Sequence, residues 1–251
     1  MKGFLGRLAR AGARLVYLFG NFKAFFALEA LRHAPGRRPP REAGEIVDRF
    51  HSLFFEAQYR PGGWNGVRWL GVEALKCPLD LWSYQEILFE LRPDLVIETG
   101  THRGGSALFL ASVLDLVGSG EVISIDITER PDRPSHRRIT YLPGSSTAPA
   151  TVQEVRERAS RAGKVMVILD SDHRAAHVRE ELRLYSPLVS PGQYLVVEDT
   201  NVNGHPVLPE HGPGPMEAVR EFLGGNPDFV ADPSRERFLI SFNPGGYLRR
   251  R

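Results

Sequence analysis

The chain has 251 residues, 42% of them hydrophobic and 25% charged, which suffices for one sizeable core, and its single cysteine, Cys77, excludes an internal disulfide framework and indicates a reducing compartment. Residues 1–41 contain nine Lys or Arg and one Glu, which leaves 23 basic and 29 acidic residues, a net charge of −6, for the rest of the chain. This acidic balance argues against nucleic acid as a partner, because a nucleic-acid-binding body needs a basic face.

Residues 1–41 are predicted to form a basic, apolar helical arm followed by a linker. Cations interrupt the apolar residues, so no run is long enough to cross a bilayer, and a cleaved secretory signal fits poorly. Two interpretations stay open: an amphipathic helix on an anionic membrane surface, or a helix packed on the body or on a second subunit of a homo-oligomer. The expected location is cytoplasmic, with peripheral contact at the inner face of the membrane as the open alternative.

Residues 42–92 are predicted to form a helical and irregular cap segment. Apolar residues recur at helical spacing over residues 45–59, and residues 64–77 indicate a short hairpin or an irregular segment. A further helix ends at Leu91, and Asp80 or Ser83 is expected to cap its N-terminus.

Residues 93–251 are predicted to form an α/β domain, because strands and helices alternate in a way typical of a parallel sheet with right-handed crossovers. The last two predicted strands are expected to close the sheet as a pair. The predicted strands are one that starts at Leu95 and those over 122–127, 139–142, 165–169, 194–197, 229–231 and 238–242, and the predicted helices cover 106–116, 151–162, 177–185 and 216–223.

The stretch from Leu95 to Ser106 predicts a buried strand, a glycine-rich turn and the start of a helix, which is where open α/β sheets bind ligands. Its spacing, Glu98-x-Gly100-x-x-x-Gly104-Gly105, departs from the G-x-G-x-x-G pattern of pyrophosphate binders. Glu98 would repel a phosphate and suits a cofactor that carries positive charge. Asp126, at the end of the next strand, can accept hydrogen bonds from ribose hydroxyls of either NAD or an adenosyl cofactor.

Further acidic and hydroxyl side chains follow the later strands and are expected to share the same sheet edge. Four carboxylates placed together would repel one another unless a divalent cation such as Mg²⁺, Mn²⁺ or Ca²⁺ bound them. His173 is adjacent to them and is a candidate general base. The scattered histidines do not indicate an iron site of two histidines and one carboxylate. The carboxylates are Asp170, Asp172, Glu198 and Asp199, the hydroxyls are Ser145 and Ser146, and a loop over 203–215 is placed to act as a lid.

These motifs resemble the cephalosporin hydroxylase/rhamnosyl O-methyltransferase family. The resemblance spans Trp64 to Phe242 and implies a three-layer, Rossmann-like class I methyltransferase fold. That fold has a mostly parallel seven-stranded sheet with an antiparallel last strand, here with an N-terminal helical extension. The motifs that carry the resemblance are Lys76–Glu86, Glu98–Ser106, Asp126, Gly144–Thr147, Asp170–His173, Glu198-Asp199, Asn203–Pro206 and Gly212–Pro215.

The resemblance implies that S-adenosylmethionine (SAM) binds over the glycine turn and that Mg²⁺ orients an acceptor hydroxyl whose proton passes to His173. Asp170 is favoured over Asp172 as a metal ligand, because it directly ends its strand. The implied SAM-binding residues are Glu98, Gly100, Thr101, Gly104, Ser106, Asp126, Ser145, Ser146 and Asp170, and the implied metal ligands are Asp170, Asp172, Glu198 and Asp199.

The leading hypothesis is a Mg²⁺-dependent SAM O-methyltransferase that acts on a hydroxyl of a sugar, a glycolipid or a similar natural product. An NAD-dependent oxidoreductase is an alternative hypothesis, because the strand, the glycine turn and Asp126 also suit NAD. The basic arm suggests a third hypothesis, a non-catalytic, membrane-attached partner of a biosynthetic complex. The acceptor and the oligomeric state stay open.

Overall fold

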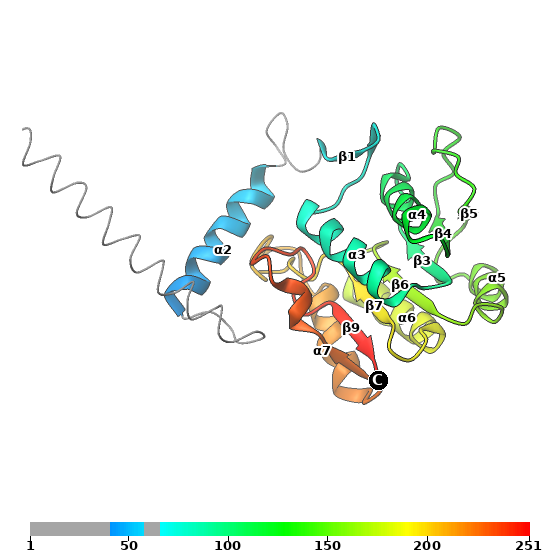
Figure 1. Cartoon of the computed structure of the whole chain (residues 1–251). Helices are drawn as coiled ribbons and strands as arrows, with labels where there is room; N and C mark the ends of the chain where they lie inside the picture. Colours follow the sequence, from blue (N-terminus) through cyan, green and yellow to red (C-terminus); the bar gives the residue numbers. More distant parts are fainter. Residues whose placement is uncertain (1–40, 58–65) are drawn as a thin grey trace, which may run out of the picture. The chain divides into compact units, whose positions relative to one another are not determined.

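A computed structural model of the chain describes residues 41–57 and 66–251 (Figure 1). The chain divides into two compact units, residues 1–50 and His51–Arg251. Most of the predicted arm lies outside the described residues, and the predicted boundaries at residues 42 and 93 stay predictions. Within the described ranges, no helix combines the length and the hydropathy that a bilayer span requires.

The second unit is built on a seven-stranded sheet with the order β5-β4-β3-β6-β7-β9-β8. Strand β3 is central, and each of its five residues pairs in parallel with both β4 and β6. The last strand, β9, runs antiparallel to β7 and β8, as the family resemblance implies for a last strand, although it lies outside the predicted segments. The strands are β3 (Leu95–Thr99), β4 (Glu121–Asp126), β5 (Ile139–Pro143), β6 (Val165–Leu169), β7 (Tyr194–Val197), β8 (Phe229–Ala231) and β9 (Tyr247–Arg250).

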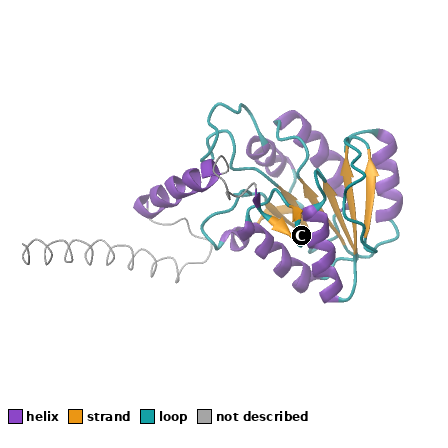
Figure 2. Cartoon of the chain, turned by 90° about the horizontal axis from the view of Figure 1, so that it is seen from above, coloured by secondary structure: helices purple, strands orange, loops and turns teal. Residues whose placement is uncertain are grey.

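Helices cover both faces of the sheet and give three layers (Figure 2). Alternate residues of β3 enter different cores, Leu95 and Ile97 on one face and Val96 on the other, because side chains alternate along a strand. The first core includes residues of α5, α6 and α7, and the second includes residues of α3 and α4. The helices are α2 (Arg41–Glu56), α3 (Pro78–Leu91), α4 (Gly105–Val117), α5 (Pro149–Ala159), α6 (Ala175–Tyr185) and α7 (Pro215–Gly225), with 3₁₀ turns at Ser186–Leu188 and Pro233–Glu236.

The prediction of a strand over 238–242 was wrong. This segment is a loop, in which Leu239 has a φ of +71° and Ile240 and Phe242 are buried in a third apolar cluster with Phe55 and Cys77. The alternating apolar residues of this segment are therefore buried by a loop and do not form a strand. The final strand, β9, reads Tyr-Leu-Arg-Arg, and its charged half conceals it from an apolar pattern.

The expected capping role of Asp80 or Ser83 was also wrong. Helix α3 begins at Pro78 with Cys77 at the N-cap and without a capping side chain. Asp80 is instead buried inside the second unit, where it accepts hydrogen bonds from the Ser241 hydroxyl (2.7 Å) and the Phe242 amide (2.8 Å). The carboxylate therefore ties α3 to the segment before β9. The expected short hairpin is present as β1 (Arg68–Trp69) and β2 (Val72–Glu73).

Candidate active site

A cavity of about 570 Å³ lies at the carboxyl ends of the parallel strands. Residues that follow five different strands line it, so the predicted convergence of motifs on one sheet edge is present in the structure. The lining includes Gly100, His102, Asp126, Ser145, Ser146, Asp170, Asp172, His173, His177 and Asp199.

The glycine turn between β3 and α4 forms one wall of this cavity. Gly100 has a φ of +87°, and a Cβ added there would lie 1.7 Å from the carbonyl oxygen of Asp170. Two strand ends therefore meet backbone to backbone, and only glycine allows this approach. The Asp170 amide completes the junction by donating to the carbonyl oxygen (3.1 Å) of Thr99.

Glu98 lies behind the turn and does not line the cavity. Its fully buried carboxylate accepts hydrogen bonds from the hydroxyls of Ser106 and Ser124, the latter at 2.6 Å, and Thr101 contacts Ser124 at 2.7 Å. Burial raises the pKa of Glu98. Four predicted SAM-binding residues, Glu98, Thr101, Gly104 and Ser106, are therefore not part of the cavity lining.

Asp126 is held rigidly in the cavity wall at the end of β4. One carboxylate oxygen accepts from the backbone amide of His102 (2.8 Å) and the other from that of Thr128 (2.7 Å). The Arg133 guanidinium, 3.1 Å away, balances the charge. A carboxylate fixed in this way can offer its remaining lone pairs to hydroxyl groups of a ligand.

Asp170, His173 and Asp199 come together at the other side of the turn. One potential ligand atom from each lies within 4.8 Å of the others, and His173 Nε2 is 3.3 Å from Asp199 Oδ2. All three side chains are partly exposed to the cavity. Two carboxylates with an imidazole beside them suit a divalent cation that prefers oxygen ligands.

Asp172 and Glu198 are predicted metal ligands that lie outside this three-residue group. Asp172 lines the cavity, but Arg174 donates to its carboxylate from the backbone amide and from Nε, both at 2.9 Å, and these bonds hold the pKa of Asp172 well below its usual range. Glu198 is buried, and burial raises its pKa. Its Oε1 accepts from Lys76 (2.6 Å) and from the Tyr84 hydroxyl (2.7 Å).

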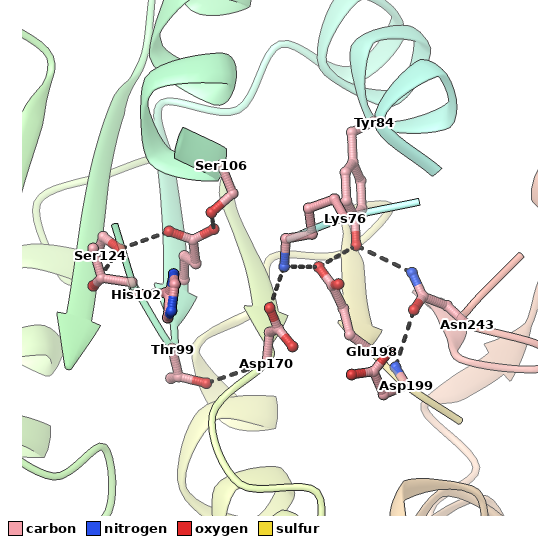
Figure 3. Close-up of polar contacts among 12 residues, drawn as sticks. Lys76, Tyr84, Thr99, His102, Ser106, Ser124, Asp170, Glu198, Asp199 and Asn243 are labelled. Atoms are coloured by element: carbon pink, nitrogen blue, oxygen red, sulfur yellow. Dashed lines mark hydrogen bonds and ion pairs between the residues drawn. The ribbon is translucent and has the colours of Figure 1, made fainter. Parts of the chain in front are cut away.

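Lys76 and Tyr84 are site residues to which sequence reasoning gave no role (Figure 3). The Lys76 ammonium also pairs with Asp170, and these carboxylates raise its pKa although burial opposes the shift. Burial raises the pKa of Asp170 to about 7, against the effect of Lys76. The only signal in the sequence was that both residues fall inside one family motif, Lys76–Glu86.

His177 lies at the Ser146 side of the cavity. Its Nε2 is 3.2 Å from the Ser146 hydroxyl and 3.6 Å from Oε1 of the buried Glu181. The neighbouring Glu181 carboxylate raises the pKa of His177. The helix α6 thus contributes a polar wall that the sequence alone did not distinguish from an ordinary helix face.

The sequence profile of the Rhamnosyl O-methyltransferase/CmcI family matches residues 62–251. A rhamnosyl O-methyltransferase of Mycobacterium leprae is 42% identical over 220 residues, which are 84% of this chain and 93% of that protein. One of Mycobacterium bovis is 39% identical over 217 residues, 84% of this chain and 87% of that protein.

Among solved structures, an apo structure of CmcI superposes with a TM-score of 0.60 at 25% identity and covers 74% of this chain and 76% of that one. A structure of CmcI with Mg and SAM gives 0.58 at 22% identity, over 74% and 77% of the two chains. The sheet order, the layers and the cavity at the strand ends are those of the class I SAM-dependent methyltransferase fold. The chain belongs to the Rhamnosyl O-methyltransferase/CmcI family, as its motifs predict.

Proposed function

We propose that this chain is a Mg²⁺-dependent SAM O-methyltransferase that methylates a hydroxyl group of a sugar, a glycolipid or a similar natural product. The class of SAM-dependent O-methyltransferase follows from the family. The metal and the acceptor class are the proposed part. The observation that supports them is that Asp170, His173 and Asp199 converge beside the glycine turn in one cavity.

The cavity suits SAM at its turn side. Gly100 lines the cavity, and Asp126 is fixed where it can accept hydrogen bonds from ribose hydroxyls. Glu98 places a carboxylate just behind the turn, which is compatible with a sulfonium cation and unfavourable for a pyrophosphate. Ser145 and Ser146 line the same cavity after β5 and offer hydroxyl groups to the cofactor.

Asp170 and Asp199 are the residues that would hold Mg²⁺, with Glu198 next to them. A bound Mg²⁺ supplies Lewis acidity, which lowers the pKa of an acceptor hydroxyl and orients it. Asp172 fits this role less well than predicted, because Arg174 already occupies its carboxylate.

His173 is positioned to take the proton from the acceptor hydroxyl. Its Nε2 lies next to Asp199 Oδ2, and the ring lines the cavity. As the proton moves to His173, the acceptor oxygen forms a bond to the methyl carbon of SAM, and the carbon–sulfur bond breaks to leave the thioether product. Holding the two reactants in one cavity contributes to the rate by proximity.

A sugar acceptor is favoured by the relatives named rhamnosyl O-methyltransferases. The loop that follows Asp199 is well placed to shape the acceptor site. Glu217 holds it by accepting from His205 (2.8 Å), Asn203 (3.2 Å) and the backbone of Gly214 (2.7 Å). A defined loop conformation at the metal side of the cavity would select among acceptors by shape.

The test is methyl transfer from labelled SAM to a panel of rhamnosides, other glycosides and a catechol. The proposal expects label in a glycoside and loss of transfer in Asp199→Ala, with Asp228→Ala, an exposed acid before β8, as the control. Undetectable SAM binding in calorimetry, or transfer to the catechol alone, would contradict it.

Of the two predicted alternatives, the oxidoreductase is not favoured, because the family is one of O-methyltransferases. The hypothesis of a membrane-attached partner depends on the basic arm over residues 1–41, most of which lies outside the described residues. Liposome co-sedimentation of the chain with and without residues 1–41 would decide it, and equal sedimentation would dispose of it.

A further inference from the structure

The most unusual electrostatic feature of the site is a lysine buried among its carboxylates. Lys76 lies in the segment between β2 and α3, and its side chain is only 3% exposed. Its ammonium group contacts Oδ2 of Asp170 and Oε1 of Glu198, one carboxylate from the end of each of two neighbouring strands. A buried lysine is tolerated only when it is paired, and here two partners share it.

The lysine belongs to a continuous network that reaches the backbone of Asp199. Tyr84 donates to the same oxygen of Glu198, and Asn243 Nδ2 donates to the Tyr84 hydroxyl (3.3 Å). Asn243 Oδ1 in turn accepts from the backbone amide of Asp199 (3.1 Å). Figure 3 shows the second oxygen of Asp170 turned away from Lys76, on the side of Asp199. The network thus holds the carboxylates on the side away from the cavity, while Asp170 and Asp199 also line the cavity.

The formal charges of the carboxylates and of Lys76 can be compared with the charge of a metal ion. Asp170, Glu198 and Asp199 carry three negative charges when ionised, and Lys76 reduces the net charge to −2. That value matches one divalent cation. Without Lys76 the same three carboxylates would present −3 and attract a cation more strongly, because the attraction between charges is strong where water is excluded.

We propose that Lys76 is a resident cation, which offsets part of the negative charge of Asp170 and Glu198 and limits the attraction of the site for a divalent metal ion. This inference rests on the metal site of the proposed function. A residue that only supports the fold would not produce the same sign of effect, because its removal would disorder the carboxylates and weaken metal binding.

The test compares the full-length protein with Lys76→Met, which removes the charge at similar length, and Lys76→Arg, which keeps it. Lys164→Met, at the other, exposed lysine of the described ranges, is the matched control. Mn²⁺ binding is followed by electron paramagnetic resonance in the presence of the thioether product of SAM, and thermal unfolding is followed in EDTA and in Mn²⁺.

We expect Lys76→Met to bind Mn²⁺ about tenfold or more tightly than the native chain, because a neighbouring positive charge is gone. Its midpoint of unfolding should fall in EDTA and recover in Mn²⁺, since the metal ion then balances the buried carboxylates. Lys76→Arg and Lys164→Met should bind Mn²⁺ like the native chain.

Equal or weaker Mn²⁺ binding by Lys76→Met would overturn the inference, and so would a variant that stays unfolded even in Mn²⁺. A native chain that binds no Mn²⁺ would instead refute the metal part of the proposed function. The two failures are therefore distinguishable in one experiment.

Discussion

The close approach at Gly100 gives a prediction that can be worked from the structure. In Gly100→Ala the new Cβ would lie 1.7 Å from the carbonyl oxygen of Asp170, about half a normal contact distance. Both atoms are fixed by backbone, so relief of the overlap requires the ends of β3 and β6 to separate. That movement displaces Asp170 from His173 and Asp199.

A second glycine provides the matched control. Gly118 ends α4 with a φ of +90°, close to the +87° of Gly100, but a Cβ added there would have nothing within 4 Å. Alanine at either position must adopt the left-handed backbone conformation, which lowers the free energy of unfolding by roughly 1–2 kcal/mol. Only at Gly100 is an overpacking cost added, about 1–3 kcal/mol or more. We therefore expect losses of about 1 kcal/mol for Gly118→Ala and about 3 kcal/mol for Gly100→Ala.

Urea unfolding of both variants measures these losses, and calorimetry measures binding of the SAM product. Gly118→Ala should bind the product like the native chain, whereas Gly100→Ala should bind it at least about tenfold more weakly, because the turn is part of the cavity wall. Equal destabilisation of the two variants, together with native affinity in Gly100→Ala, would refute the reasoning.

Other predictions concern single side chains. Asp170→Asn should weaken Mn²⁺ binding by more than about 100-fold, beyond the effect of most outer-shell changes, whereas Asp172→Asn should change it by less than about fivefold; the reverse order would make Asp172 the ligand. Asp126→Ala should weaken binding of the SAM product by about 10–100-fold in calorimetry, and an unchanged affinity would remove Asp126 from the site. Burial lowers the pKa of His51 from 6.5 to about 4, so the stability that neutral His51 provides is complete above pH 6.5 and is lost as the pH falls toward 4. Between pH 7 and pH 4 the native chain should lose about 3 kcal/mol more in urea unfolding than His51→Gln, and equal losses would refute the assignment.

Local patterns were enough to predict most of the fold. The apolar runs of β3 and β6 are buried on both faces, so each appears in the sequence as an uninterrupted hydrophobic stretch bounded by turn residues. Strand β9 escaped notice because it lies near the edge of the sheet, where Arg249 can point to solvent. The sequence instead predicted the last strand at 238–242, because the apolar residues of that segment alternate, and in the structure they are buried in a loop.

Several predicted site residues line one cavity at the sheet edge, but the sequence did not reveal all of their neighbours. Strand ends converge by topology, which is why Asp126, Asp170 and Asp199 could be brought together from the sequence. Lys76 could not, because its partners Asp170 and Glu198 are 94 and 122 positions away and no local pattern marks a buried ion pair. The same holds for Asp80, whose partner Ser241 is 161 positions away.

Sequence position alone also could not separate Asp170 from Asp172. Asp170 and Asp172 lie one and three positions after the strand that ends at Leu169, close enough for either side chain to reach the edge of the sheet. In the structure they differ in their neighbours. Arg174 donates a hydrogen bond to the carboxylate of Asp172, whereas Asp170 lies next to His173 and Asp199.

The central claim is tested most directly by methyl transfer from labelled SAM to a rhamnoside by the native chain, measured in EDTA and again after Mg²⁺ is restored. We predict that transfer is lost in EDTA, returns with Mg²⁺ and does not return in His173→Ala. Transfer that continues unchanged in EDTA, or that His173→Ala retains, would contradict the account.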